Sequence, residues 1–265
     1  PVAATLADFD RIAGAADTAG CVFAPFQNNR LQPFFDKMQD VINSGILGRI
    51  VYIRAVWGRF ARRWDWQTLQ KNMGGTLFNT GPHAIDQALA LFGWEHVPEV
   101  FCRMSCDNPF GADAEDHCAV TLYDPQRQRP QIDVLLSGYN GFSHDLYQVH
   151  GTFGHLRGGG RELAWRWFDP QTAPDHAMWE WSVDRKYPSE ELEWKDDAWE
   201  VDLDKDVRVS GYTLTSFSSG AELFYENLYD TIRNGMELLI QPWQVRRQIA
   251  VLEECHRQNP LPRNE

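Results

Sequence analysis

EVFCRMSC, residues 99–106, opens the stretch that decides the fold of this chain. Four more strand-length runs follow it: DHCAVTLYD (116–124), QIDVLLSGYN (131–140), DLYQVHGTFGHLR (145–157) and ELAWRWFD (162–169). Each run is rich in apolar, β-branched or aromatic residues, and Gly, Pro, Asn or Asp separates it from the next. Successive strands without intervening helices predict an antiparallel sheet.

Helical patterns flank these runs on both sides. Apolar residues at helical spacing predict helices over residues 32–44, 82–92, 221–233 and 243–258, and GRIVYIRAVWG (48–58) is typical of a further strand. The sum predicts an α+β fold, an open and mainly antiparallel β-sheet with helices packed on one face.

The first residues have the pattern of a helix that is already under way. The chain opens with Pro1 rather than Met, Thr5 can cap a helix that starts at Leu6, and CVFAPF (21–26) is typical of a short buried strand. We therefore expect a further N-terminal portion upstream of Pro1 in a longer protein.

A long acidic segment separates the predicted sheet from the last two helices. Residues 170–211 carry four tryptophans: Trp179, Trp181, Trp194 and Trp199. Because a plain linker would not hold four such side chains, we expect this excursion to pack on the body of the protein.

Composition excludes several classes of partner. The chain has 265 residues, of which 43% are hydrophobic, and 37 acidic against 25 basic residues give a net charge of −12. Nucleic acid and anionic membrane surfaces both need a basic footprint, so neither is expected as a partner. The five cysteines form no zinc-knuckle pattern, and we expect buried, reduced thiols in a cytoplasmic protein.

GGTLFNTGPHAIDQAL, residues 74–89, is the candidate active-site corner. Pro82 suits the first turn of a helix, and His83 then lies at the positive end of the helix dipole, which favours a neutral imidazole. A neutral imidazole can take a proton from a substrate hydroxyl, whereas the amide of Asn79 can only hold that hydroxyl. Asp86 can orient the ring or face another element. The alternative interpretation is an ordinary helix start.

Other polar and aromatic residues allow a functional and a structural interpretation. Trp64 can wall a sugar pocket or pack at a loop edge, and Arg30 can bind an anionic group or solvate a helix start. GTFGHLRGGG (151–160) lacks the strand and helix of a nucleotide loop, so turns or a bulge are expected there. The histidines show no metal-ligand spacing, and no metal site is predicted.

Three blocks of the sequence resemble the glucose–fructose oxidoreductase and inositol dehydrogenase (Gfo/Idh/MocA) family of NAD(P)-dependent sugar oxidoreductases. They are FQNNRLQPFFDKMQDVINSGILGRIVYI (26–53), GGTLFNTGPHAIDQALALFG (74–93) and FYENLYDTIRNG (224–235). The resemblance implies a Rossmann domain followed by an open, mainly antiparallel sheet domain.

The resemblance also implies domain bounds. The family's catalytic lysine lies in a Glu-Lys-Pro motif, whose proline is matched by Pro1. The lysine and the cofactor-binding loop are then expected upstream of Pro1. Residues 1–29 become the end of the dinucleotide-binding domain, a helix plus a strand, and residues 30–265 the C-terminal substrate-binding and oligomerisation domain.

For activity, the resemblance implies hydride transfer between a sugar, cyclitol or polyol and NAD or NADP. His83 and the upstream lysine would manage the hydroxyl proton, and Asn79 replaces an aspartate that the family commonly has. Arg30, Trp64 and Asp86 are the expected substrate-binding residues. Because the cofactor domain and the lysine are not in this chain, the sequence leaves open whether it is an enzyme by itself.

Two alternatives stay open beside this one. The same architecture could run an NAD-assisted glycosidase or lyase reaction, in which the cofactor is recycled within each turnover. It could also be a non-catalytic self-association module, since the open sheet face is a natural surface for a homo-oligomer.

Overall fold

The computed structural model describes residues 1–181, 185, 187–202, 207–209, 212–214 and 220–262. The core of the fold is an eight-stranded open sheet with the order β2-β3-β4-β1-β5-β6-β7-β8. Its strands are β1 (Ile50–Trp57), β2 (Glu99–Ser105), β3 (His117–Tyr123), β4 (Gln131–Ser137), β5 (Tyr147–Gly151), β6 (Gly154–Gly159), β7 (Glu162–Trp167) and β8 (Lys195–Glu200). A small second sheet pairs β9 (Val207–Val209) with β10 (Tyr212–Leu214).

The sheet is mainly antiparallel, as the sequence predicts. Only β1 and β4 run parallel, with Ile53 opposite Ile132, and the other neighbours in the large sheet are antiparallel. β1 comes first in the chain but lies between β4 and β5, so it joins two meanders into one sheet. Such a long-range pairing cannot be read from local patterns.

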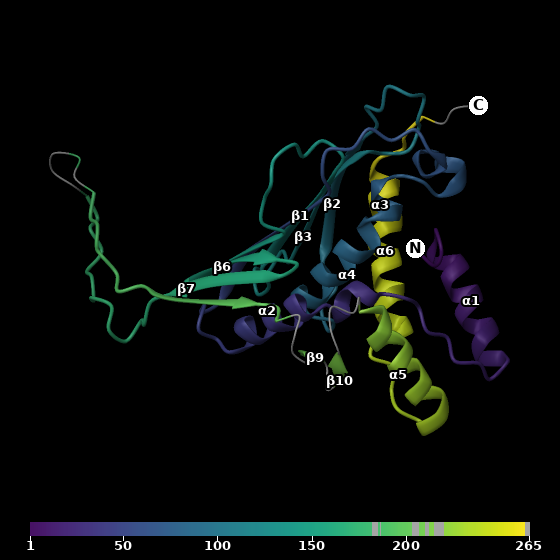
Figure 1. The fold of residues 1–265 in the computed structure, drawn as a ribbon. Helices are drawn as coiled ribbons and strands as arrows, with labels where there is room; N and C mark the ends of the chain where they lie inside the picture. Colours follow the sequence, from purple (N-terminus) through teal and green to yellow (C-terminus); the bar gives the residue numbers. More distant parts are fainter. Residues whose placement is uncertain (182–184, 186, 203–206, 210–211, 215–219, 263–265) are drawn as a thin grey trace.

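The helices cover one face of this sheet (Figure 1). They are α1 (Leu6–Thr18), α2 (Pro33–Asn43), α3 (Thr76–Asn79), α4 (Gly81–Phe92), α5 (Ala221–Asn234) and α6 (Pro242–Gln258). Short 3₁₀ turns occur at Asn28–Leu31, Trp66–Thr68 and Gln70–Asn72. The expected helices and most strands of the sheet domain are thus confirmed within one or two residues, but the run 145–157 forms two strands, β5 and β6, and β4 ends at Ser137, three residues before the end of its predicted run.

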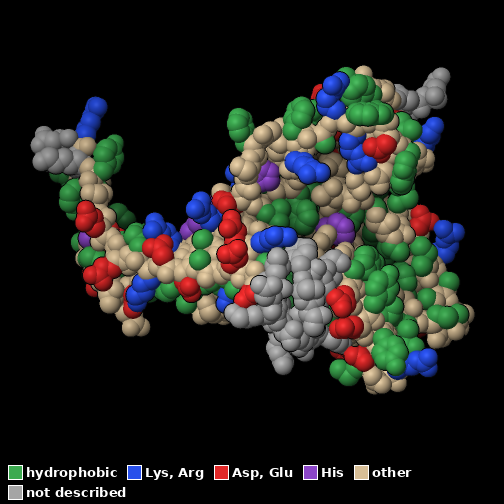
Figure 2. Space-filling model, viewed as in Figure 1, with side chains coloured by type: hydrophobic (Ala, Val, Ile, Leu, Met, Phe, Trp, Pro, Cys, Tyr) green, Lys and Arg blue, Asp and Glu red, His purple; other side chains and the backbone are tan. Residues whose placement is uncertain are grey.

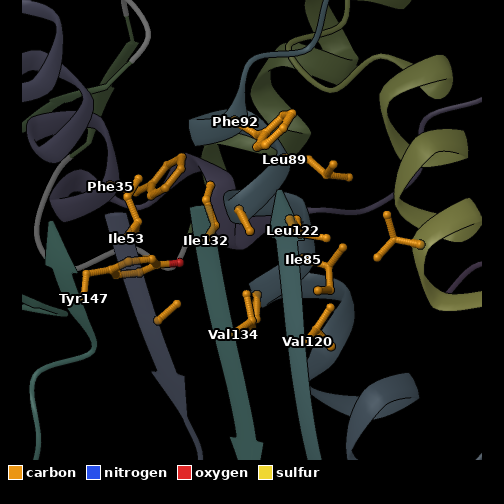
Figure 3. Close-up of a cluster of buried hydrophobic side chains, with 14 of the residues drawn as sticks. Phe35, Ile53, Ile85, Leu89, Phe92, Val120, Leu122, Ile132, Val134 and Tyr147 are labelled. Carbon is orange, nitrogen blue, oxygen red and sulfur yellow. The ribbon is translucent and has the colours of Figure 1, made fainter. Parts of the chain in front are cut away.

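The hydrophobic core lies between α4 and the centre of the sheet. Figure 3 shows Ile85, Leu89 and Phe92 of α4 against side chains from β1, β3 and β4. All three are at most 2% exposed. Along a strand, successive side chains point to opposite faces of the sheet. In β3 and β4 every second side chain therefore faces α4 and is buried. The core therefore holds α4 and its N-terminal turn rigidly against the sheet.

The N-terminal segment differs from the prediction in one respect. Thr5 caps α1 by accepting from the backbone N–H of Asp8, as expected. The strand expected over residues 21–26 is wrong, because that segment has no β pairing among the described residues and Cys21 is exposed. Phe26 packs edge-to-face on Phe224 of α5 instead, with ring centroids 4.8 Å apart. An apolar run becomes a strand only where another strand offers its backbone groups.

The acidic excursion also differs from the prediction. Its described residues form a long arm that projects away from the body beyond β7 and β8 (Figure 1), and at the base of this arm Trp194 contacts Phe168 edge-on, with ring centroids 5.7 Å apart. Trp181 is 81% exposed, while Trp199 of β8 is partly buried. We call residues 170–194 the arm.

Three of the five cysteines, Cys102, Cys118 and Cys255, are buried free thiols, whereas Cys21 is exposed and Cys106 half-buried. Among the described residues, no helix combines the length and the apolar character needed to cross a membrane.

Candidate functional site

The candidate site is built on the turn that joins α3 to α4. Gly75 precedes α3 with φ +103°, and a Cβ there would lie 2.2 Å from Oε1 of Glu115. The backbone N–H of Thr76 donates to the carbonyl oxygen of Glu115 (2.8 Å), and that of Leu77 donates to Oε1 of the same residue (2.9 Å). The close approach therefore requires glycine at position 75.

α4 begins at Gly81, one residue earlier than predicted, with Pro82 in its first turn. The N–H of His83 donates to the carbonyl of Thr80 (3.2 Å), which places the imidazole at the start of the helix. Burial is the main cause that lowers the pKa of His83, and the positive Pro1 amino group adds to it, while Asp86 opposes it. The imidazole of His83 is therefore expected to be neutral, as the sequence predicts, but the leading cause is burial and not the helix dipole.

His83 also carries an unpartnered polar atom. Its Nδ1 is buried and has no hydrogen-bond partner in the described structure. Leaving such an atom unpaired costs on the order of 1–3 kcal/mol, so the position favours a partner supplied from outside these residues.

Asn79 lies next to a cavity of about 210 Å³ at the ends of β1, β3 and β4. Its surface is mostly apolar by area but carries many polar side chains, namely Arg59, Arg62, Arg63, Thr76, Thr80, Asn108, Glu115, Asp116, Ser137 and Tyr139. Asn79 is exposed and sits at the last position of α3, four residues before His83. A cavity of this size that presents many polar groups fits a small ligand with several hydroxyl groups.

Sequence analysis missed two acidic residues of this cavity, Glu115 and Asp116. Glu115 is 2% exposed, and burial raises the pKa of its carboxyl to about 7. Asp116 accepts a hydrogen bond from the hydroxyl of Tyr139 (2.6 Å). Their position in the sequence could have identified them, because the two acidic residues stand immediately before β3 and residues at strand ends often belong to functional sites.

Arg30 and Asp86, both predicted to bind substrate, are paired with each other. Arg30 donates through Nε and Nη2 to the two carboxylate oxygens of Asp86 (2.7 and 2.5 Å). It also donates to Gln244 and lies 4.5 Å over the ring of Trp94. Asp86 is 1% exposed, and neither residue lines the cavity. The pair joins the 3₁₀ turn Asn28–Leu31 to α4, and the hydrogen bond of Arg30 to Gln244 adds α6. A role of either residue in substrate binding stays a prediction.

Trp64 is on the surface beside the cavity. It is 75% exposed and contacts Phe110 edge-on, with centroids 5.8 Å apart. Its neighbours Arg62 and Arg63 line the cavity, whereas Trp64 itself does not. Of the five predicted site residues, the structure thus brings only Asn79 to the cavity, with His83 one turn along the helix.

The glycine-rich segment 151–160 forms turns on either side of β6, as expected. Gly158, Gly159 and Gly160 all have positive φ. No described part of the chain brings three His, Cys, Asp or Glu side chains together in a way that could hold a metal ion.

Comparison with known proteins agrees with this architecture. Residues 35–157 match the family model of the GFO/IDH/MocA C-terminal domain. An uncharacterized oxidoreductase of Schizosaccharomyces pombe is 24% identical over 254 residues, which cover 91% of this chain and 66% of that protein. A Bacillus subtilis protein named scyllo-inositol 2-dehydrogenase (NADP(+)) is 26% identical over 57% of this chain and 41% of its own length. The chain is thus shorter than these relatives.

Solved structures show the same fold. A putative oxidoreductase from Yersinia pestis superposes with a TM-score of 0.68 at 21% identity, covering 98% of this chain and 68% of that one. An oxidoreductase from Agrobacterium radiobacter, solved with NAD+, L-tartaric acid and magnesium, gives a TM-score of 0.66 at 16% identity, over 97% and 68% of the two chains. The solved structures thus share the fold of this chain, and the family-model match covers residues 35–157 of it.

Proposed function

We propose that this chain, with its GFO/IDH/MocA-type sheet domain, is the substrate-binding part of an NAD(P)-dependent oxidoreductase acting on a sugar, cyclitol or polyol. The observation that carries the proposal is the buried, unpartnered Nδ1 of His83, which lies four residues after Asn79; Asn79 lines the cavity, and His83 lies beside it in the first turn of α4. Relatives named as oxidoreductases, one of them an NADP-dependent inositol dehydrogenase, support the same class of reaction.

The described residues do not fit a nicotinamide dinucleotide by themselves. No strand, glycine-rich loop and helix follow one another among them, and the glycines of 151–160 lie in hairpins of the sheet. At the start of α1 the capping position is filled by Thr5, with the carboxylate of Asp8 beside it, which disfavours a phosphate. We therefore place the nucleotide-binding domain, with its lysine, upstream of Pro1 in a longer protein.

The positions of Pro1 and His83 support that placement. The charge at Pro1 contributes to the lowered pKa of His83 in this chain, so the first residue lies within electrostatic reach of the imidazole; in a longer protein the proline nitrogen is an uncharged amide and this contribution disappears. A lysine directly before Pro1 would enter the same environment. Residues 1–29 would then be the last part of the nucleotide-binding domain, and residues 30–265 the substrate domain.

Two residues of this chain, His83 and Asn79, have a defined task in the proposed reaction. Oxidation of a carbinol releases a hydride, for which a nicotinamide is the chemical acceptor, and a proton. Neutral His83 accepts that proton, and Asn79 holds the hydroxyl in place. Because an amide cannot take a proton, the proton chemistry rests on His83 and the upstream lysine.

The test uses the longer gene product that contains the nucleotide domain. His83→Gln should lower kcat with a polyol substrate by about 10²- to 10⁴-fold, the usual loss when a general base is removed. His96→Gln is the matched control, because it changes another half-buried histidine, which follows α4 and does not line the cavity. Unchanged turnover in His83→Gln would refute the proposed role.

A second measurement tests where the cofactor binds. NADH and NADPH are titrated into the folded 265-residue chain while the emission of its eleven tryptophans is followed. We expect no saturable binding. Saturable binding in the micromolar range would show that this chain holds its own nucleotide site, contrary to the proposal.

A further inference from the structure

The cavity beside Asn79 is lined by a group of arginines that the proposed reaction has not used. They are Arg59, Arg62 and Arg63, and all three lie in the loop that follows β1. In Figure 2, drawn from the same side as Figure 1, several Lys and Arg side chains lie at the upper end of the body, where Figure 1 labels α3. The whole chain has a net charge of −12, so this local positive charge is opposite in sign to that of the protein.

Arg63 has an acidic partner close by in sequence. Its Nε and Nη2 donate to the two carboxylate oxygens of Asp65 (2.9 and 2.8 Å), and Nη2 also donates to Gln67 (2.5 Å). These bonds hold the guanidinium group against its own loop. The charge of Arg63 is therefore balanced without a ligand.

Arg59 and Arg62, which we call the free arginines, have no such partner. Within the described part of the chain neither of them forms an ion pair or donates a hydrogen bond. Cζ of Arg62 lies 4.8 Å from the ring centroid of Phe110, a contact that leaves the guanidinium N–H groups free to donate. Two guanidinium groups at one cavity thus remain available to an anion.

The acidic groups of the cavity do not neutralise the free arginines. Asp116 accepts hydrogen bonds from the hydroxyl of Tyr139 (2.6 Å) and from the backbone N–H of Asp107 (3.1 Å). Glu115 is buried, and burial raises the pKa of its carboxyl to about 7. Below pH 7 this carboxyl is largely protonated, so it then adds little negative charge to the cavity. The cavity therefore keeps an excess of positive charge, which concentrates anions at its mouth.

The loop that carries the free arginines is anchored to the end of β4. Gly58 has φ +111°, and a Cβ there would lie 2.3 Å from the carbonyl oxygen of Ser137, so this close approach requires glycine. The backbone N–H of Ala61 donates to the carbonyl oxygen of Gly138 (2.9 Å). The free arginines thus extend from a backbone that is already held in place, which lowers the entropy cost of binding a ligand.

We propose that the substrate of this cavity carries an anionic group, a carboxylate or a phosphate, which Arg59 and Arg62 bind while Asn79 contacts its hydroxyl groups. Guanidinium N–H groups match the spacing of the oxygens in both anions and form strong, charge-assisted hydrogen bonds with them. The substrate is then a sugar acid or a sugar phosphate and not a neutral polyol. This inference rests on the proposed function and adds the charge of the substrate to it.

Binding to the folded 265-residue chain tests the inference without any turnover. Isothermal titration calorimetry compares two anions with their neutral counterparts, D-gluconate with D-glucitol and D-glucose 6-phosphate with D-glucose. We expect at least one anion to bind about tenfold more tightly than its counterpart, and this advantage to shrink when NaCl is raised from about 0.05 M to about 0.5 M. An advantage of gluconate identifies a carboxylate as the anion, and an advantage of glucose 6-phosphate identifies a phosphate.

Substitution of the free arginines locates the contact. Arg59→Gln with Arg62→Gln should remove the advantage of the anion and leave the circular dichroism unchanged. Arg54→Gln with Arg103→Gln is the matched control, because it removes the same charge from two exposed arginines that do not line the cavity. Equal dissociation constants for each anion and its counterpart would overturn the inference. So would a lack of binding by both anions, or a loss in the control as large as that in Arg59→Gln with Arg62→Gln.

Turnover by the longer gene product separates this inference from the proposed function. Oxidation of D-glucitol or D-glucose, with no preference for either anion in binding, would refute the anionic substrate and keep the proposed reaction. Tight binding of an anion that the longer gene product does not oxidise would keep the anion site and count against the proposed reaction.

Discussion

The core beneath α4 and the arm are both rich in large apolar side chains, yet they differ completely in burial. Phe92 of α4 is 1% exposed, whereas Trp181 of the arm is 81% exposed. In the core, β-strand alternation and helical spacing both direct side chains toward the same space. In the arm no such pattern exists, and Trp181 covers no surface of the body, whereas Trp194 at its base contacts Phe168. The number of apolar residues therefore sets how much apolar surface a segment can bury. The spacing of those residues along the chain decides whether that surface is buried.

The largest effect should come from cutting into the core. Phe92→Ala should lower the free energy of unfolding by about 3–5 kcal/mol, because it leaves a cavity among tightly packed neighbours. Urea denaturation with an unchanged m value measures this loss. A loss below about 1 kcal/mol would mean that the region under α4 can collapse into the space and is not packed as described.

A comparable effect should follow from breaking the buried ion pair beside the core. Arg30→Met leaves the carboxylate of Asp86 buried without its partner, which typically costs about 3–5 kcal/mol. The double variant Arg30→Met, Asp86→Leu should recover most of that loss, because no uncompensated charge remains. Urea denaturation of the single and double variants forms the cycle. Equal losses in both variants would show that packing, and not charge, dominates here.

The next effect depends on pH. Burial raises the pKa of Glu115 to about 7 from an ordinary value of 4.5, so the folded state binds this proton more tightly than the unfolded state does. Its contribution to stability is present below pH 4.5 and is lost as the pH rises to 7. The difference in unfolding free energy between Glu115→Gln and the unchanged protein should therefore grow by about 3 kcal/mol across this window.

Chemical denaturation at several pH values measures that difference. Glu193→Gln in the arm is the control, because its side chain is exposed and the change should leave the pH dependence as it was. A flat difference for Glu115→Gln would mean that water or a cation reaches the cavity carboxyl.

The smallest effect on stability should come from the arm. Trp181→Ser, examined at a concentration where the chain is monomeric, should change the free energy of unfolding by less than about 0.5 kcal/mol, as exposed substitutions usually do. Thermal unfolding of the dilute chain measures this. A loss comparable with that of Phe92→Ala would break the comparison, because it would place the tryptophan in the chain's own core.

Local patterns in the sequence predicted most of the elements, and the structure shows why they did so well. The cap at Thr5, the ends of α2 and α5 at Gly45 and Gly235, and the strand runs from Glu99 to Trp167 all depend on neighbours in sequence. The segment 21–26 has the same apolar character but lacks a strand partner, and so local reasoning failed there.

The candidate site was only partly predictable. His83 and Asn79 share a helix-start motif, so their proximity follows from their spacing of four residues. Glu115 approaches Gly75 from a distant part of the chain, and the bond between Arg30 and Asp86 joins residues 56 positions apart. Both contacts depend on the arrangement of the helices on the sheet.

The sequence by itself determined the α+β class, the bounds of most elements and the histidine-bearing helix start, because these follow from side-chain periodicity and capping over a few residues. Only the tertiary structure decided the place of β1 between β4 and β5, the pairing of Arg30 with Asp86, the acidic lining of the cavity and the projection of the arm. Each of these features depends on contacts between residues that are far apart in the sequence. The packing of the whole chain determines which of those contacts form.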